Sequence, residues 1–473
     1  MNFLSLTFAG FGALVFGSWW GMPQRLRPWV LAAANLAFAL WFGPKALCSL
    51  GLVWLLTLAF GRLLAHRPRR WVLLTGCCAV AAPLLLYKLL PAAAAWQPEL
   101  AALGQLTAPV GISFYVFKAI SCLVRLYQSQ LSPPSPLVLF NYLGFFAQLS
   151  SGPIQDPRTL LPQLQAPAAG FQTSLAWLGC VRFCWGMFLK KCLADILAGY
   201  LGALTHPQNF YGLSVLWSLV TYSLYLYFDF ASYSQMSIGL ANLLGIQVEE
   251  NFLSPYLSRS IGEFWRRWHI SLSSFLRDFI YIPMGGSRRG PVVLVAATLT
   301  TFVISGLWHG VTGGFLVWGA LHGLYLLAGR ATGGLRQKLW SLVGQSAPNA
   351  PVRSLCSWLC TCLLVAVGWF FFATATLDQA AQAAACLFAP ASFSVQYVKE
   401  SITLLGFTPD VLARLGLFAA AAFGVDWASR ARGFGAWAAQ RKPWQLVLLC
   451  YGCVFATLFY GSTSTLPNVY FAF

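Results

Sequence analysis

The chain has 473 residues, of which 58% are hydrophobic and only 9% are charged, and its mean hydropathy is +0.67. Soluble globular proteins carry about 25% charged residues, so these residues cannot supply a soluble surface and that class is excluded. Apolar runs of membrane-spanning length recur along the whole chain and do not alternate polar with apolar residues. This pattern predicts an all-α, polytopic membrane protein and disfavours a β-barrel.

The net charge of +18 is high enough to suggest a nucleic-acid partner, but its distribution argues otherwise. Lysines and arginines stand in short clusters between apolar runs, as the positive-inside rule expects of cytoplasmic loops. No stretch interleaves basic residues with exposed aromatics along one face. We therefore expect these charges to set topology and to meet anionic lipid headgroups, with the bilayer and not nucleic acid as the partner.

Thirteen cysteines are scattered along the chain, mostly within apolar runs. Cys450 and Cys453 form a CxxC pair, but no second pair completes a zinc site. Buried cysteine packs as a small apolar residue. We expect no disulfide, no metal and no bound cofactor.

The first apolar runs cover residues 3–20, 28–42, 46–61 and 71–90. No basic segment precedes the first run, so we interpret it as a retained helix rather than a cleaved signal peptide. The basic clusters Arg25–Arg27 and Arg62–Arg70 predict cytoplasmic loops, which places the N-terminus outside.

The middle of the chain contains runs that polar residues or helix breakers interrupt. Runs at 110–126 and 137–149 are followed by SSGPIQDP, where Gly152, Pro153 and Pro157 must interrupt a helix. Irregular backbone at membrane depth is tolerated only inside protein or beside a cavity. Residues 172–200 are predicted to form one helix with a cytoplasmic Lys190–Lys191 end.

The remaining predicted spans complete one membrane domain over residues 1–473, with about eleven spans in all. They cover residues 213–230, 292–307, 315–328, 355–375, 412–427 and 444–460. Residues 91–109, which include Glu99, are expected to form an external loop or interfacial segment, and residues 376–410 an external one. The C-terminal tail is expected on the same external side as the N-terminus.

Three of the five histidines lie between Asn251 and Gly323. His309 sits in Leu-Trp-His-Gly at the end of an apolar run, beside glycines that loosen the helix. A neutral imidazole there could take a proton from an attacking hydroxyl. The alternative is a hydrogen-bonded structural histidine at a helix end.

The other two histidines of this stretch admit other roles. His322 would lie about 20 Å from His309 in one unbroken helix, so packing is the favoured role unless the glycines fold the segment back. His269, in EFWRRWH, could orient or deprotonate a group that enters from the cytoplasm. Equally, its segment could be an interfacial amphipathic helix with its tryptophans at headgroup level.

Weaker signals surround these histidines. The turn GGSRRG offers backbone amides and the guanidiniums of Arg288 and Arg289 to a phosphate-bearing donor, although a basic cytoplasmic turn explains it equally well. Asp229 lies among aromatic residues and needs a partner, such as an arginine or a backbone amide. No HExxH or GxSxG motif occurs, which disfavours hydrolase and metalloprotease functions.

Several motifs together resemble those of the membrane-bound O-acyltransferase (MBOAT) family, most of all its bacterial branch of alginate O-acetylation and teichoic-acid D-alanyl transfer proteins. The matching segments are FFAQLSSGPIQDP (145–157), YFDFASYSQMSIGLANLLGI (227–246), ENFLSPYLSRSIGEFWRRWHISLSSFLRDFIYIPMGGSRRG (250–290), Trp308-His309-Gly310 and the terminal VYFAF. The resemblance is close over residues 110–330 and looser in the flanking helices.

The resemblance implies helices that enclose a channel, with His309 as the catalytic histidine and His269 as a second histidine on the cytoplasmic side. It implies that Asp278 belongs to the pattern of this branch. It also implies an acetyl donor in the cytoplasm, acetyl-CoA, and transfer across the membrane to a polysaccharide or to a periplasmic SGNH-type partner. The arginines of this stretch, among them Arg266 and Arg267, would then attract the donor phosphates. Trp308 or an amide near Gly310 is the candidate oxyanion donor.

On this interpretation, His269 and His309 mark two ends of one transmembrane reaction path. Two alternatives stay open. The cargo could be D-alanine or a longer acyl group for teichoic acid or peptidoglycan. A non-enzymatic transporter of envelope precursors is disfavoured because the chain shows no paired halves with broken helices.

Overall fold

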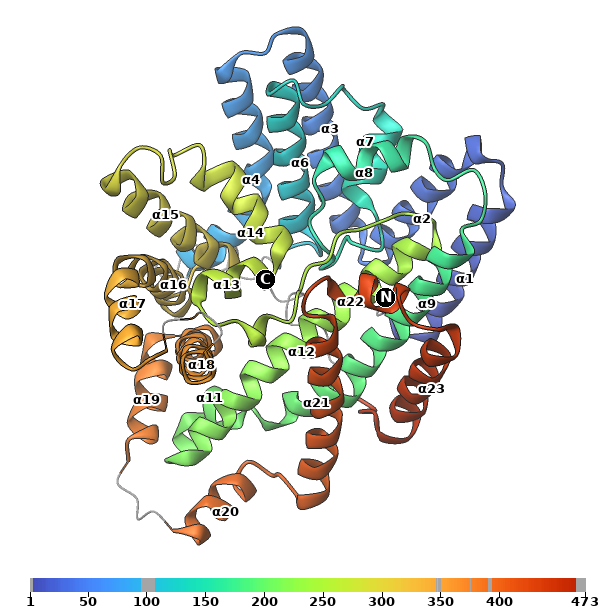
Figure 1. Ribbon diagram of the computed structural model, residues 1–473. Helices are drawn as coiled ribbons and strands as arrows, with labels where there is room; N and C mark the ends of the chain where they lie inside the picture. The colour runs from blue at the N-terminus through green and yellow to red at the C-terminus, as the bar shows by residue number, and fades with distance from the viewer. Residues whose placement is uncertain are drawn as a thin grey trace.

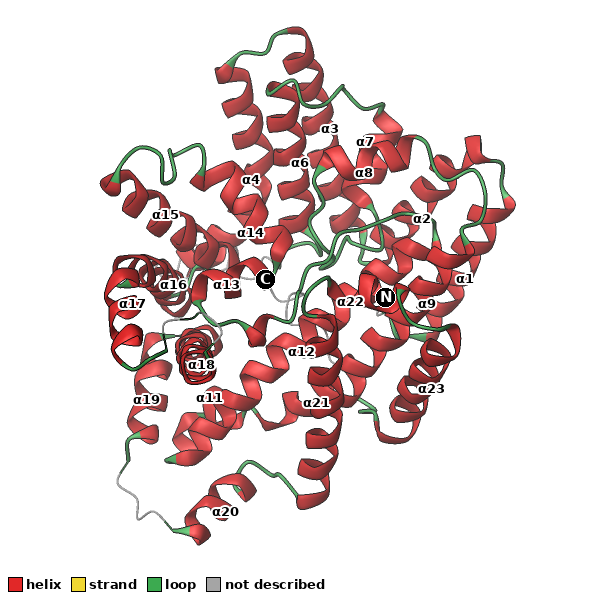
Figure 2. Cartoon of the chain, viewed as in Figure 1, coloured by secondary structure: helices red, strands yellow, loops and turns green. Residues whose placement is uncertain are grey.

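The computed structural model describes residues 3–94, 107–345, 347, 350–374, 376–389 and 394–464. Every regular element in these ranges is helical and none is a strand, which confirms the all-α class (Figure 2). Seven helices in these ranges are long and apolar enough to cross a membrane. The total of about eleven spans stays a prediction. Glu99 and the terminal VYFAF lie outside the described residues.

The N-terminal half consists of α1 Leu6–Gly21, α2 Arg27–Trp41, α3 Pro44–His66, α4 Arg70–Ala94, α6 Ile112–Tyr127, α7 Pro136–Gly144, α8 Pro157–Gln165 and α9 Thr173–Phe188. The middle contains the π-helical turn η3 Leu189–Ala194, α10 Asp195–Leu197, α11 Gly202–Thr205, α12 Leu213–Leu243, α13 Ile261–Arg267, α14 Ile270–Leu276, the π-helical turn η7 Arg277–Tyr281, α15 Pro291–His309 and α16 Gly313–Ala331. The remaining helices are α17 Gly333–Leu342, α18 Pro351–Ala373, α19 Leu377–Leu387, α20 Val395–Thr403, α21 Pro409–Ser429, α22 Gly433–Ala439 and α23 Pro443–Tyr460. Proline begins many of these helices, where its fixed φ and missing N–H cost nothing.

Two predicted helices differ from the structure. Helix α12 continues to Leu243, because small residues after Phe230 pack inside the protein and keep the helix intact. The helix predicted over residues 172–200 is confirmed in its extent, since α9, the π-helical turn η3, α10 and a final 3-10 turn follow one another from Thr173 to Tyr200 without a break. The predicted exposed Lys190–Lys191 end is wrong, because Lys190 is buried. The cause is an inward ion pair of Lys190, described below.

Helix α12 lies at the centre of the bundle (Figure 1). In its most apolar window 61% of residues are buried, whereas the corresponding value is 11% for α21 and 33% for α15. Two large clusters of buried apolar side chains meet along α12, one from the N-terminal helices and one from the C-terminal helices. The outer helices turn mostly apolar side chains outward, as a bilayer requires.

The segment between α7 and α8 is irregular and almost completely buried, which confirms the predicted break at SSGPIQDP. Side chains satisfy its backbone: Asn35 accepts from the amide of Phe146 at 2.9 Å, and Ser237 donates to the carbonyl of Ala147 at 2.6 Å. The buried ammonium of Lys118 donates to Gln148 at 2.8 Å. These bonds stabilise irregular backbone inside the helical bundle.

Helices α15 and α16 approach closely through glycine, and together with α17 and α18 they form the left side of Figure 1. A methyl group at Gly319 would collide with the carbonyl oxygen of Phe302, and one at Gly306 with that of Phe315. We expect Gly319→Ala to lower the thermal midpoint of the detergent-solubilised protein by several degrees. Gly329→Ala on the same helix meets open space and is the matched control. Equal melting of both variants would contradict this packing.

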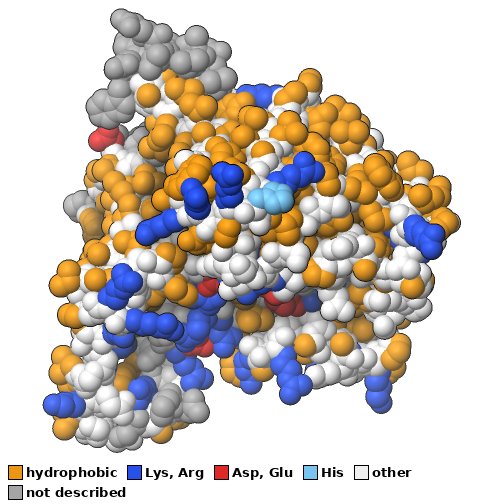
Figure 3. All heavy atoms as spheres, turned by 90° about the horizontal axis from the view of Figure 1, so that it is seen from above, with side chains coloured by type: hydrophobic (Ala, Val, Ile, Leu, Met, Phe, Trp, Pro, Cys, Tyr) orange, Lys and Arg blue, Asp and Glu red, His pale blue; other side chains and the backbone are white. Residues whose placement is uncertain are grey.

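The surface is largely apolar, with lysines and arginines gathered in patches and few acids on the face that Figure 3 shows. This matches the composition, in which 30 basic residues stand against 12 acidic ones.

Candidate functional site

His309 is the last residue of α15, and its ring is buried. Gly310 continues in an extended conformation, which ends the helix and lets the chain reverse into α16. The imidazole lies edge-on to Trp318 and Phe372, with ring centroids 5.2 and 4.9 Å apart. Trp308 lies 4.6 Å away on the other side. His309 is therefore held in an aromatic cage at the point where two helices turn.

His269 connects α13 to α14 and is also buried. Its backbone is left-handed, with φ 43° and ψ 55°, which is uncommon for a residue with a side chain and costs about 1–3 kcal/mol. The amide of Ile270 donates to the carbonyl of Asn251 at 3.0 Å and secures the turn. Such backbone strain concentrates at functional sites.

Asn251 fixes the tautomer of His269. The Asn251 Oδ1 atom accepts from the backbone amide of Ser271 at 3.2 Å and from its hydroxyl at 2.9 Å, so this atom is the oxygen. It lies 3.2 Å from His269 Nδ1, which must therefore carry the proton and leave Nε2 as the basic nitrogen. Burial lowers the pKa of His269 to about 3, so the ring is neutral at physiological pH.

The structure brings His269 and His309 together. The ring of Trp308 lies 6.2 Å from His269 and 4.6 Å from His309, so one indole contacts both histidines. Phe117 of α6 stacks on the same indole at 5.5 Å. The expectation that these histidines mark separate ends of a path is wrong. The turn between α13 and α14 enters the protein core instead of lying at a headgroup surface.

His322 belongs to the neighbouring aromatic layer. The break at Gly310 folds α16 back on α15, so the estimate of about 20 Å for an unbroken helix does not apply. Trp318 contacts both His309 and His322, each at 5.2 Å. The indole N–H of Trp265 donates to His322 Nδ1 at 3.2 Å. His322 therefore links α13 to α16 and stands one ring away from His309.

Lys88 is a site residue that the sequence analysis passed over. Its ammonium, from the membrane helix α4, donates to the carbonyl of Trp308 and lies 3.5 Å from that of His309. A cation at the C-terminal end of a helix is favourable because the last carbonyls there lack helical partners. A lone lysine inside an apolar run was the signal that could have found it.

We expect Lys88→Met to lower the rate of any reaction that depends on His309 about tenfold, because hydrogen bonds to a charged group contribute about 1.5–3 kcal/mol and here position His309. Lys45→Met is the matched control, since Lys45 also caps a carbonyl, that of Thr107, but from an exposed site on α3. The measurement is the initial rate of the His309-dependent reaction at equal amounts of folded protein. A Lys88→Met protein as fast as the Lys45 control would contradict the positioning role.

Asp278 forms the wall of a polar cleft. Arg125 bridges Asp156 at 2.8 Å and Asp278 at 3.1 Å, and Arg277 binds the other oxygen of Asp278 at 2.8 Å. Burial opposes the ionisation of Asp156, but hydrogen bonds from Arg158 and Arg125 outweigh it and hold the pKa of this carboxyl below its usual range. These ion pairs place ordered charges along one wall of the cleft.

The cleft itself has a volume of about 60 Å³ and is lined by Ser121, Ile154, Gln155, Asp156, Glu249, Glu250, Ile270, Ser271, Ser274, Phe275, Asp278 and Phe279. Ser271 lines it and also binds Asn251, which holds His269. Hydrogen bonds of Ser271 and Asn251 therefore connect the wall of this cleft to His269.

Asp229 lies in the buried centre of α12, and its partner is a lysine rather than an arginine or an amide. Lys190 binds Asp229 at 2.6 Å and Asp195 at 2.8 Å, and Lys191 binds Asp195 at 3.2 Å. Two acids and two lysines thus form a balanced ionic group. It pins the π-helical turn η3 to α12 and places Asp229 in a structural role.

The four arginines proposed for the donor are spread over two segments. Arg267 is bound to Glu263 at 3.0 Å and to the carbonyl of Leu253 at 2.9 Å. Arg288 and Arg289 lie in the exposed connection between η7 and α15, and Arg266 is exposed on α13. A common donor site for the four stays a prediction.

The two candidate oxyanion donors differ. The Gly310 amide donates to the carbonyl of Gly306 at 3.2 Å as the last bond of α15, so it is committed to the helix. Trp308 lies between the two histidines and is the better placed of the two.

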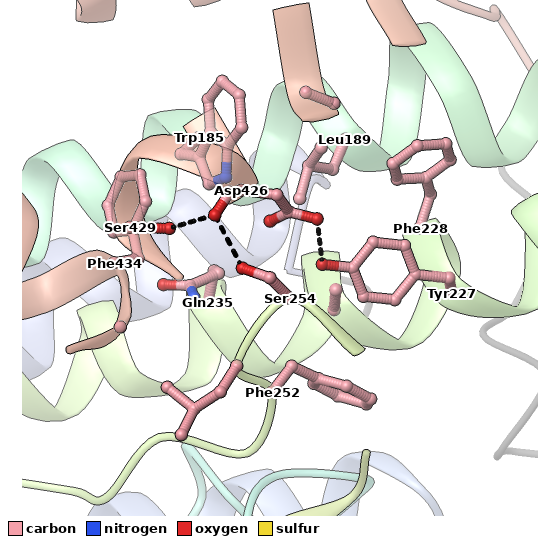
Figure 4. A pocket seen from close by; sticks show the side chains of 14 residues that line it. Trp185, Leu189, Tyr227, Phe228, Gln235, Phe252, Ser254, Asp426, Ser429 and Phe434 are labelled. Carbon is pink, nitrogen blue, oxygen red and sulfur yellow. Dashed lines mark hydrogen bonds between the residues drawn. The ribbon is translucent and has the colours of Figure 1, made fainter. Parts of the chain in front are cut away.

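A second small cavity, of about 20 Å³, lies between α12, α21 and α22 and has room for about one water molecule (Figure 4). Tyr227 donates to the carboxylate of Asp426 at 2.7 Å, and Ser254 donates to the Asp426 carbonyl at 2.8 Å. These bonds join α21 to α12 and to the segment after Asn251. None of the three histidines is among the residues that line this cavity.

Across the described residues, no group of three His, Cys, Asp or Glu side chains is arranged to hold a metal ion. The ionisable groups around Trp308 are two imidazoles and one ammonium. The site offers proton transfer within an aromatic enclosure.

The family model of MBOAT, the membrane-bound O-acyltransferase family, matches residues 55–369. The chain is 39% identical over 284 residues to the Azotobacter vinelandii protein named "Probable alginate O-acetylase AlgI", which covers 59% of this chain and 54% of that protein. It is 30% identical over 300 residues to a Helicobacter pylori "Peptidoglycan O-acetyltransferase", with 58% and 55% covered.

It is also 29% identical over 300 residues to a Bacillus subtilis "Teichoic acid D-alanyltransferase", with 60% of this chain and 74% of that protein covered. The chain spans little more than half the length of the alginate O-acetylases that it matches. The matched residues 55–369 make up more than half of the chain and contain Lys88, His269, His309 and His322. The chain therefore belongs to the membrane-bound O-acyltransferase family.

Proposed function

We propose that this multi-pass protein is an O-acetyltransferase of the bacterial inner membrane. It takes an acetyl group from cytoplasmic acetyl-CoA and passes it across the membrane to an envelope polysaccharide, or to a periplasmic SGNH-type partner that acetylates the polysaccharide. The observation that carries this proposal is the pair of buried histidines on one tryptophan, with a charged cleft leading toward them.

In the proposed reaction, the acceptor hydroxyl attacks the carbonyl carbon of the thioester and His309 accepts its proton. The tetrahedral intermediate collapses, the C–S bond breaks, and the proton from His309 passes to the departing thiolate. A donor or acceptor held against Trp308 lies within reach of both imidazoles, which supplies positioning. The aromatic cage around His309 limits water and therefore limits hydrolysis of the thioester.

His269 acts beside His309 as a neutral acceptor, since Asn251 holds its proton on Nδ1. Arg277 and Asp278 of the polar cleft belong to the arginine-rich 259–289 segment, and Arg125 binds Asp278. Guanidiniums of this segment, including Arg288 and Arg289, attract the phosphates of the donor. The basic loops are then cytoplasmic and both termini periplasmic.

Acetyl is favoured over D-alanyl as the cargo because the identity to proteins named alginate O-acetylase is 36–39%, against 29% for the B. subtilis D-alanyltransferase. The acceptor is proposed as a polysaccharide of the alginate type on the same ground.

The test uses inside-out membrane vesicles from cells that express the protein, with polysaccharide supplied inside the vesicles. Labelled acetyl-CoA outside should yield polymer-bound acetate that mild base releases, and a labelled D-alanyl thioester donor should yield little. A faster D-alanyl reaction would change the cargo. If the protein is folded but neither donor labels the polymer, acyl transfer is refuted. An altered export of the polymer would then favour a transporter.

A further inference from the structure

A large cavity lies between α13, α16, α17 and α18, away from the polar cleft. Its volume is about 900 Å³, near the upper end of the roughly 300–1,000 Å³ that small-molecule sites occupy. Its residues come from the start of α13, the last turns of α16, the length of α17 and the first half of α18. None of them lines the cleft beside Asp278.

The inner wall of this cavity is apolar. Ile261 is buried, Leu326 and Leu364 are partly buried, and Leu339 and Leu342 of α17 are 53% and 81% exposed. Helix α17 is short and carries basic residues beside these two exposed leucines. This combination is typical of a helix that lies in the headgroup region of a bilayer. The cavity is therefore a space beneath an interfacial helix, open to lipid.

Three arginines stand at this cavity, and no acid is among the residues that line it. Arg259 precedes α13, Arg330 ends α16, and Arg336 lies on α17, and all three are exposed. Arg336 donates to the carbonyl of Gly329 at 2.6 Å, which fixes α17 over the end of α16. The site thus combines positive charge at its rim with an apolar interior.

We propose that this cavity binds one anionic phospholipid, with its phosphate at Arg259, Arg330 and Arg336 and an acyl chain beneath α17. The ligand must be both anionic and apolar, and the leaflet that faces basic loops is rich in such lipids. A soluble phosphate compound would leave the apolar wall in water. A neutral lipid would bring no negative charge to the arginines at the rim.

The bound lipid would brace the aromatic layer behind the catalytic site. Tyr325 lines the cavity and contacts His322 at 5.7 Å, and Trp265 of α13 donates to His322. A lipid that joins α13, α16 and α18 therefore holds the elements that carry His269 and Trp318. The site itself does not depend on which acyl group the enzyme transfers.

The test is native mass spectrometry of the detergent-purified, full-length protein with phosphatidylglycerol or phosphatidylethanolamine added. We expect one phosphatidylglycerol molecule to survive mild activation, and at least tenfold less phosphatidylethanolamine. The triple variant Arg259→Gln, Arg330→Gln and Arg336→Gln should lose this lipid. The matched control Arg67→Gln, Arg69→Gln and Arg70→Gln removes the same charge from another loop and should retain it.

A second variant tests the apolar part. A methyl group at Gly329 would meet no atom within 4 Å, so Gly329→Trp should fill the cavity without moving the helices, and it should also displace the lipid. If both triple variants retain phosphatidylglycerol equally, the lipid is held by general attraction to the basic surface and the proposed site is refuted. Equal binding of the two lipids, or competition by acetyl-CoA for the bound phosphatidylglycerol, would overturn it too.

Discussion

Replacing His309 by glutamine is expected to lower acetyl transfer from acetyl-CoA by a factor of about 10²–10⁴, the usual contribution of a positioned general base. Glutamine keeps the size and polarity of the side chain but cannot accept the proton of the acceptor hydroxyl. The ring cage of Trp308, Trp318 and Phe372 would remain in place. The measurement is the initial rate in the vesicle assay at equal amounts of folded protein.

His206→Gln is the matched control, because His206 is exposed before a short helical turn and is not one of the rings that contact His309 here. Its rate should equal that of the unaltered protein. His269→Gln should also lower the rate, and Asn251→Leu should imitate it, since Asn251 sets the tautomer of His269. A His309→Gln protein with an unchanged rate would remove His309 from the chemistry.

Lys190→Met is expected to destabilise the protein by about 3–5 kcal/mol, the cost of removing one partner from a buried ion pair. Without Lys190, this group keeps two carboxylates but only one lysine, Lys191, and that lysine contacts Asp195. The excess negative charge then lies next to α12, the most buried helix in the bundle. The measurement is the thermal midpoint in detergent together with the yield of monodisperse protein.

The double variant Lys190→Met, Asp229→Asn should recover most of this loss, because the remaining Lys191–Asp195 pair is neutral. Lys191→Met is the matched single control, and it should cost less because Asp195 keeps Lys190. A double variant as unstable as Lys190→Met would show that the residues contribute by packing rather than by charge.

The sequence was sufficient for the fold class, for most helix positions and for the buried break at SSGPIQDP. These features follow from local patterns, namely long apolar runs and the helix-breaking residues Gly152, Pro153 and Pro157. The family resemblance also pointed to the segments that hold His269 and His309. A single sequence does not show, however, which side chains of separate helices meet.

The side chains that contact one another in the site are far apart in the sequence, so the sequence alone did not indicate these contacts. Lys88 and His309 are separated by 221 positions, and Lys190 and Asp229 by 39. Nothing in the apolar run around Lys88 indicates that its ammonium caps α15. The turn at Gly310 and the left-handed backbone of His269 bring both imidazoles to Trp308. The order of the predicted spans had placed the two imidazoles at opposite ends of a path.

One measurement tests most directly whether the protein acylates an envelope polysaccharide with His309 as the general base. The quantity is the number of base-released acetyl groups per sugar in polysaccharide from a strain that lacks the gene and carries either the unaltered protein or His309→Gln. We predict acetylation with the unaltered protein and almost none with His309→Gln at the same membrane level of protein. Equal acetylation in the two strains would contradict the account.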